Sequence, residues 1–199
     1  MTVTTWVAGV FLVLVSIQRL TETFARRGTL QGQRQMGWSF YAMFALHSTI
    51  IIGSYAELLA TRRSLEVGWC AVGLVLYLAS LVLRNMAIRT LGRFWSLHIE
   101  IRNQHLLVRE GVYNYVRHPA YAAIVLEVLS IPLTVNAWWV MLIAALTYIP
   151  LLALRLRFEE KALVEKFGDV YRRYQTEVGA LVPHWSSLRH PSEEQQGHS

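Results

Sequence analysis

Polar side chains that could bind a charged ligand occur at two places, each beside a long apolar run. The first is Arg117-His118-Pro119-Ala120-Tyr121, where a cation, an imidazole and a phenol surround a proline. The second is Arg155 and Glu159, one helical turn apart after another apolar run. An arginine in a binding site can hold a carboxylate, enolate or phenolate oxygen by charge-assisted hydrogen bonds.

The sequence lacks the motifs of several common enzyme classes. It has no glycine-rich dinucleotide or phosphate loop and no HExxH pair. Cys70 is the single cysteine, so neither an intrachain disulfide nor a cysteine zinc set is expected. No local motif supports a Ser-His-Asp triad. The net charge is +6, but the basic residues lie between apolar segments, which favours an anionic membrane surface over nucleic acid.

Long apolar runs separate the polar segments and predict membrane spans. The chain is 54% hydrophobic, which is too apolar for a typical soluble domain of this size. Since ~20 residues cross the hydrocarbon core, we predict an all-α fold, a polytopic membrane helix bundle of about five spans with a small cytosolic region. The spans are residues 3–17 extended to 20, 37–60, 67–83, 120–135 and 138–154.

The connectors predict an orientation. Those after the first and third spans are rich in arginine, and those after the second and fourth are neutral or uncharged. The positive-inside tendency therefore places the N-terminus outside and the C-terminus in the cytoplasm. The first span has no cleavable signal pattern, so we expect it to be retained. The short turn at Asn136 makes the last two spans an antiparallel pair, whose cytoplasmic ends must meet.

This pairing predicts one cytoplasmic polar cluster, made of His105, Tyr113, Arg117, His118, Tyr121, Arg155 and Glu159. Simpler roles stay open, because arginine and tyrosine also serve as interfacial anchors, and an Arg–Glu pair four apart is a common helix ion pair. Glu127 is different, since a carboxylate within an apolar run is costly and usually faces a cavity or a partner. For His47, which also interrupts an apolar run, two roles stay open: the same role as Glu127, or that of a buried, hydrogen-bonded residue, which we favour.

Two smaller elements are expected outside the spans. Residues 97–102 alternate apolar and polar side chains, which predicts a strand, with a turn at 103–104 and a return strand at 106–108. Residues 155–174 carry a helical stripe, which predicts an amphipathic helix after the fifth span.

The segment from Leu91 to Pro183 resembles the isoprenylcysteine carboxyl methyltransferase family. The Arg-His-Pro-x-Tyr element alone also occurs in phospholipid N-methyltransferases and sterol reductases, so the combination of motifs carries the resemblance. Residues 91–101 and Glu127 resemble the bacterial branch, which includes alkylpyrone and alkylresorcinol O-methyltransferases. The motifs are His105-Leu106-Leu107-Val108, Gly111-Val112-Tyr113, Arg117-His118-Pro119-Ala120-Tyr121, Arg155-x-x-x-Glu159-Glu160, Phe167-Gly168, Tyr171 and Tyr174.

The resemblance implies an integral membrane enzyme that uses S-adenosylmethionine to methylate a lipophilic acceptor by direct in-line transfer. The acceptor atom would be a carboxylate oxygen, as in isoprenylcysteine, or an enol or phenol oxygen. Arg155 would hold this acceptor, and Glu127 is a candidate acceptor contact; no metal is expected. The implied cofactor-binding residues are His105, Leu106, Leu107, Val108, Tyr113, His118, Pro119, Ala120, Tyr121 and Glu159.

We accordingly divide the chain into three N-terminal spans (1–90), a methyltransferase core (91–185) and a disordered tail (186–199). The expected location is a bacterial inner membrane, with the acceptor entering from the bilayer, S-adenosylmethionine arriving from the cytosol and no nucleic-acid partner. The oligomeric state is left open. The alternatives are a phospholipid amine N-methyltransferase, a reductase of the sterol type, and a non-catalytic membrane binding or scaffold protein. An amine acceptor would gain nothing from a facing arginine.

Overall fold

The structure, a computed structural model, describes residues 3–24, 33–35, 37–61, 65–92, 99–101 and 107–184. Its helices and strands follow in the order α1 (Val3–Phe24), β1 (Gln33–Gln35), α2 (Gly37–Thr61), α3 (Val67–Leu91), β2 (Ile99–Ile101), the 3-10 helix η2 (Gly111–Asn114), α4 (Pro119–Thr134), α5 (Trp138–Phe167) and α6 (Asp169–Glu177).

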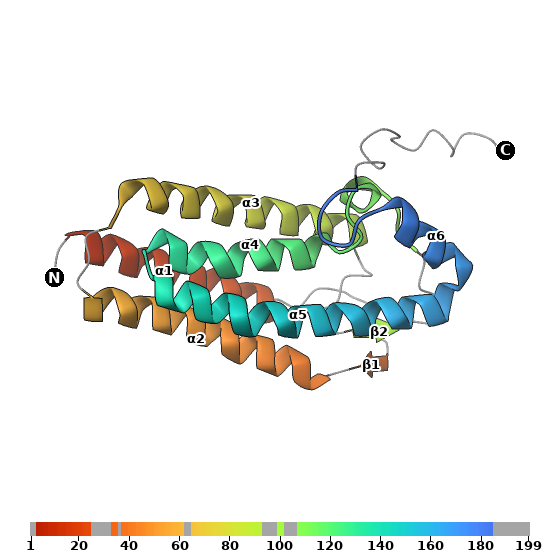
Figure 1. The fold of residues 1–199 in the computed structure, drawn as a ribbon, viewed down its shortest axis with the longest axis horizontal. Coiled ribbons are helices and arrows are strands. Elements are labelled where there is room, and N and C mark those ends of the chain that lie inside the picture. Colours follow the sequence, from red (N-terminus) through yellow and green to blue (C-terminus); the bar gives the residue numbers. More distant parts are fainter. Residues whose placement is uncertain are drawn as a thin grey trace.

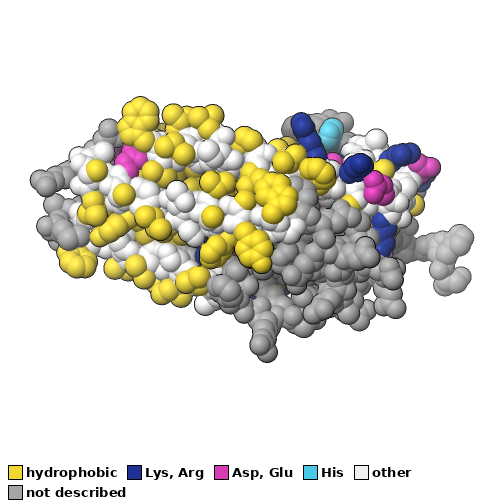
Figure 2. All heavy atoms as spheres, turned by 90° about the horizontal axis from the view of Figure 1, so that it is seen from below, with side chains coloured by type: hydrophobic (Ala, Val, Ile, Leu, Met, Phe, Trp, Pro, Cys, Tyr) yellow, Lys and Arg dark blue, Asp and Glu magenta, His cyan; other side chains and the backbone are white. Residues whose placement is uncertain are grey.

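Helices α1 to α5 lie side by side and alternate in direction, forming an elongated bundle (Figure 1). In the described part of the chain, α1, α2, α3 and α5 are long and apolar enough to cross a membrane, whereas α4 is a shorter apolar helix. Apolar side chains cover much of the bundle surface, and charged side chains gather at the end that carries α6 (Figure 2). The predicted all-α membrane helix bundle is confirmed.

Small and polar residues line the inside of this bundle. Ser39, Ser54, Ser80 and Ser130 are fully buried, while many large apolar side chains of α1, α2, α3 and α5 are exposed. This inverted pattern is typical of membrane helices, where small residues let the backbones approach closely. Gly73 on α3 shows this approach, because a Cβ atom there would stand 2.4 Å from the Thr134 hydroxyl on α4.

Helices α4 and α5 form the predicted antiparallel hairpin. Pro119 occupies the first turn of α4, where its missing N–H needs no partner. The turn after α4 is closed by a 2.8 Å hydrogen bond from the Ala137 amide to the Pro132 carbonyl. Asn136 has a φ of 56°, a left-handed conformation that asparagine tolerates better than most residues. The cytoplasmic ends predicted to meet therefore lie together, beside α6 (Figure 1).

Two predictions about the smaller elements need correction. A strand does form at Ile99–Ile101, but it pairs antiparallel with Gln33–Gln35 between α1 and α2. The predicted return strand is wrong, since Leu107 and Val108 have no strand assignment; residues 102–106 lie outside the described part. A three-residue strand carries too little periodicity to identify its partner.

The predicted helix after the fifth span is not a separate element. Helix α5 continues without a break through Arg155 and Glu159 to Phe167, and α6 follows after Gly168. Gly168 has a φ of +58°, a backbone conformation that favours glycine at a helix end. The predicted tail, residues 186–199, lies outside the described residues.

Candidate functional site

The two polar segments meet at one hydroxyl group. Tyr121, in the first turn of α4, donates a hydrogen bond from its hydroxyl to the Glu159 carboxylate on α5. Arg155 Nε donates to the same hydroxyl over 2.9 Å, and Arg155 Nη1 donates to Ser39 Oγ on α2 over 2.9 Å. Three helices therefore hold Arg155 and Tyr121, and both side chains are buried.

His118 lies between two carboxylates. Its ring stacks on the Tyr121 ring with 5.6 Å between centroids and 8° between planes. His118 Nε2 is 3.2 Å from a Glu160 oxygen, and Nδ1 is 3.9 Å from a Glu159 oxygen. The residue before Pro119 thus connects the start of α4 to both glutamates of α5.

Arg117 ties the loop before α4 to the C-terminal segment. Its Nη2 and Nε lie 2.7 and 2.9 Å from one oxygen of Glu160. Its Nη1 donates to the backbone carbonyls of Gln175, over 3.0 Å, and Val178. The Gln175 side chain also donates to Glu160 over 3.1 Å. Glu160 is therefore bonded to Arg117. Glu159 is the carboxylate that contacts Tyr121.

The segment after α6 folds back against the same loop. The amides of Arg117 and His118 donate to the carbonyls of Gly179 and Ala180, each over 2.9 Å. A Cβ atom on Gly179 would stand 2.0 Å from the Val182 carbonyl oxygen, so only glycine fits this turn. The C-terminal segment is therefore part of the site's framework.

Three buried tyrosines support this framework from the side of η2 and α6. Burial raises the pKa of Tyr113, Tyr171 and Tyr174, and the nearby Glu160 carboxylate raises the pKa of Tyr171 further. Their phenols therefore stay protonated at neutral pH and can donate hydrogen bonds. The Tyr174 hydroxyl donates to the Tyr113 carbonyl, and the Arg109 guanidinium lies 4.9 Å from the centre of the Tyr174 ring.

Most of the predicted cofactor-binding residues that the structure describes lie at this end of the bundle. Tyr121, His118 and Glu159 touch one another directly. Leu107 packs against the cluster of Tyr171, Tyr174 and Val178, whereas Val108 and Ala120 pack around Tyr113. His105 and Leu106 lie outside the described residues. That these residues bind a cofactor stays a prediction.

Sequence reasoning missed the contacts of Ser39 and Glu160. Ser39 bonds to Arg155, but a serine within an apolar span gives no sign of its partner. Glu160 follows Glu159 directly, so the two side chains point about 100° apart around α5. Glu159 thus reaches Tyr121, while Glu160 reaches Arg117.

Glu127 belongs to a second polar group, which we term the inner charge cluster: Arg19, Glu22, His47, Arg84 and Glu127. The Glu127 carboxylate is fully buried and pairs with the Arg84 guanidinium and with Arg19 Nε, 2.6 Å away. Glu22 lies 2.8 Å from Arg84. His47 accepts a 3.2 Å hydrogen bond from Arg19, which confirms the interpretation of His47. A direct acceptor contact by Glu127 stays a prediction.

Comparison with known proteins identifies the family. The model of the isoprenylcysteine carboxyl methyltransferase (ICMT) family matches residues 71–165. Protein-S-isoprenylcysteine O-methyltransferase B of Arabidopsis thaliana is 32% identical over 150 residues, which are 70% of this chain and 73% of that protein. The chain belongs to the ICMT family. It is therefore a membrane methyltransferase, as the sequence motifs indicated.

The relatives that this chain matches differ in length from it. Protein YpbQ of Bacillus subtilis is 29% identical over 77% of this chain and 95% of its own length, in agreement with the bacterial branch. The Schizosaccharomyces pombe protein-S-isoprenylcysteine O-methyltransferase is 35% identical over 104 residues, and this chain covers 44% of it. The chain thus spans about half the length of this relative.

A solved structure supports the ICMT fold. The eukaryotic intramembrane Ras methyltransferase ICMT superposes with a TM-score of 0.60 at 24% identity, over 70% of this chain and 51% of that chain. The matching family region, residues 71–165, contains α4 and most of α3 and α5. It therefore includes Tyr121, Arg155 and Glu159, the three residues joined by the Tyr121 hydroxyl.

Proposed function

We propose that this ICMT-family protein transfers a methyl group from S-adenosylmethionine to an oxygen of a lipophilic acceptor in the membrane. One observation carries the proposal. The Tyr121 hydroxyl joins a carboxylate, Glu159, to a guanidinium, Arg155, at the end of a membrane bundle. A negative group suits the sulfonium donor and a positive group suits an anionic acceptor, so the pair matches both reactants.

The residues around Glu159 fit the donor. The Glu159 side chain is 30% exposed, so a ligand can reach it, and the stacked rings of His118 and Tyr121 lie beside it. Carboxylate oxygens and aromatic faces both stabilise a sulfonium cation. When bound, S-adenosylmethionine would supply an activated methyl group. Glu159, Tyr121 and His118 would hold it, together with the backbone near Tyr113.

Arg155 is positioned to bind the acceptor. Its guanidinium is buried, and hydrogen bonds to Tyr121 and Ser39 fix its direction. A carboxylate, enolate or phenolate oxygen beside this group would gain charge-assisted hydrogen bonds. Holding the oxygen in line with the methyl group and excluding water are the main requirements of a displacement reaction. The arginine thus favours an oxygen acceptor over the amine of a phospholipid N-methyltransferase.

The bundle suggests how the two reactants meet. Helices α1 and α3, which the two arginine-rich connectors follow in the sequence, both run toward the end of the bundle that holds α6 and the site (Figure 1). Positive connectors favour the cytoplasmic side. The proposed orientation in a bacterial inner membrane therefore has the N-terminus outside and the site facing the cytosol. The acceptor's hydrocarbon part would stay in the bilayer while its polar end reaches Arg155.

Two variants on α5 test the site. Glu159→Gln should weaken binding of S-adenosylmethionine, measured by calorimetry on the purified protein without acceptor, about 10-fold or more, because it removes the carboxylate that faces the sulfonium charge. The matched control is Glu165→Gln, an exposed glutamate on the same helix. Absence of any binding by the unmodified protein would favour a non-catalytic membrane protein.

Transfer is tested with labelled S-adenosylmethionine and a total lipid extract, followed by mass analysis of the methylated product. Arg155→Ala should lower turnover about 10- to 100-fold with little change in donor binding, since a charged hydrogen bond contributes ~1.5–3 kcal/mol. Arg157→Ala, an exposed arginine two residues away, is the control. Unchanged turnover in Arg155→Ala would refute the acceptor role, and an N-methylated product would support the amine alternative.

A further inference from the structure

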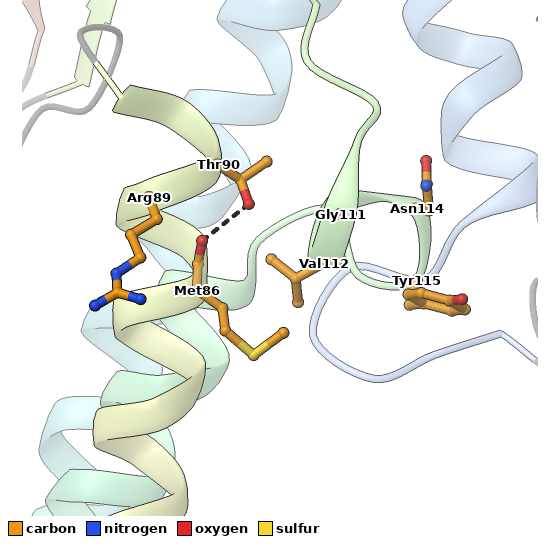
Figure 3. A pocket seen from close by; sticks show the side chains of 7 residues that line it. All are labelled: Met86, Arg89, Thr90, Gly111, Val112, Asn114 and Tyr115. Carbon is orange, nitrogen blue, oxygen red and sulfur yellow. Dashed lines mark hydrogen bonds between the residues drawn. The ribbon is translucent and has the colours of Figure 1, made fainter.

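A pocket separate from the proposed site opens between the last turns of α3 and η2 (Figure 3). Its volume is about 540 Å³. The lining of this pocket does not include Arg155, Tyr121 or Glu159. The lining residues that matter here are Met86, Arg89 and Thr90 from α3, with Val112, Asn114 and Tyr115 from the segment around η2.

The apolar wall of the pocket continues a stripe on the outer face of α3. Val75, Leu78, Val82 and Met86 are all exposed, and their spacing of three or four residues places them on one side of the helix. Because α3 is long and apolar enough to cross a membrane, this stripe would face hydrocarbon in a bilayer. Met86 and Val112 face each other across the pocket (Figure 3). A lipid chain lying along α3 would therefore run into the pocket.

The rim of the pocket is cationic and polar. Arg89 lies in the last turn of α3, is exposed, and has no ion pair or hydrogen bond from its side chain among the described residues. A cation at a helix C-terminus complements the helix dipole, but that role needs no pocket beside it. Asn114 and the half-exposed Tyr115 add hydrogen-bonding groups on the opposite wall.

We propose that this pocket binds one anionic membrane phospholipid. An acyl chain would lie against the α3 stripe and between Met86 and Val112, and the phosphate of the headgroup would be held by Arg89. Charge complementarity selects this ligand, because the apolar surface ends at a basic group where a phospholipid places its negative charge.

The lipid would contact the segment that leads into the proposed site. Val112 packs in one cluster with Ala87 of α3 and with Tyr113. The Tyr113 carbonyl in turn accepts the hydrogen bond from Tyr174 of α6. A bound phospholipid would thus fasten the η2 segment to the membrane surface. Binding itself requires neither the methyl donor nor transfer.

The test compares two lipids that differ only in headgroup. The 199-residue chain in detergent is titrated with phosphatidylglycerol or with phosphatidylcholine carrying the same acyl chains, and bound lipid is counted by native mass spectrometry. We expect the protein to bind phosphatidylglycerol more tightly than phosphatidylcholine. Arg89→Ala should lower the affinity for phosphatidylglycerol about fivefold, which is the change expected for loss of one basic group near an anionic headgroup. Arg89→Lys should restore most of the affinity.

Two controls make the result decisive. Arg157→Ala removes an exposed arginine of α5 outside the pocket and should bind phosphatidylglycerol like the unmodified protein. Met86→Trp, which fills the pocket from an exposed position, should reduce binding of both lipids. Equal affinity for the two lipids, or equal losses in Arg89→Ala and Arg157→Ala, would overturn the proposal. So would a Met86→Trp protein that keeps phosphatidylglycerol but loses methyl transfer, because the pocket would then hold the acceptor.

Discussion

Replacement of Glu127 by glutamine should destabilise the folded protein strongly. The inner charge cluster holds two arginines and two glutamates, so its formal charge is zero with His47 neutral. Glu127→Gln leaves Arg19 and Arg84 to share Glu22 alone. Removal of one partner from a buried ion pair costs about 3–5 kcal/mol, because the other charge stays buried without compensation. We expect about 3 kcal/mol here, since Glu22 still contacts both arginines.

Thermal unfolding in detergent, followed by circular dichroism, measures this loss. For a chain of this length 1 kcal/mol shifts Tm by roughly 2–4 °C, so Glu127→Gln should lower Tm by about 6–12 °C. Glu66→Gln, at an exposed position just before α3, is the matched control and should change Tm little. A Tm for Glu127→Gln within about 2 °C of the unmodified protein would refute the reasoning.

A double variant separates charge balance from packing. Arg84→Met in the Glu127→Gln background leaves Arg19 with Glu22, which again sums to zero. The double variant should therefore unfold at a higher temperature than Glu127→Gln alone. If the second substitution lowers Tm further, the cluster stabilises the bundle by its individual contacts and not by its charge balance.

Two further substitutions test the packing of the bundle. Gly73→Ala should destabilise the folded protein by about 1–3 kcal/mol, because its Cβ would stand 2.4 Å from the Thr134 hydroxyl. The control Gly68→Ala, whose Cβ would have nothing within 4 Å, should be neutral or stabilising. Equal Tm values for the two variants would contradict the close approach of α3 and α4. Glu57→Gln should lower the free energy of unfolding by about 1 kcal/mol. The Glu57 carboxylate accepts hydrogen bonds of 3.2 and 2.9 Å from two backbone N–H groups in the first turn of α5. An unchanged Tm would show that these bonds do not stabilise the bundle.

The sequence predicted the helices well because membrane spans are defined by length and apolarity. All five predicted spans lie within α1 to α5, apart from residue 135 at the end of the fourth. What it could not predict is the position of α2 in the bundle. Apolar runs such as residues 37–60 carry no information about which neighbour each face meets. The contact of Ser39 with Arg155 was therefore invisible in the sequence.

The candidate site was predictable where chain connectivity constrains it. The turn at Asn136 is too short to separate α4 from α5, so Tyr121 and Arg155 had to lie near each other. No such constraint links the loop before α4 to α6. The contacts of Arg117 with Gln175 and Val178 depend on the break at Gly168, which returns the chain toward the bundle.

Helix α4 shows how one short helix serves both polar groups. Tyr121 and Glu127 are six residues apart, which corresponds to about 9 Å along the axis and places the side chains about 120° apart around it. Tyr121 accordingly meets α5, while Glu127 meets Arg19 of α1 and Arg84 of α3. The inner charge cluster therefore fixes the rotation of α4 from one face, and this rotation sets the direction in which Tyr121 points on the other. An acceptor could contact Glu127 directly only by reaching between α1 and α3, whereas Arg155 lies at the end of the bundle beside Glu159, where the proposed donor and acceptor would meet.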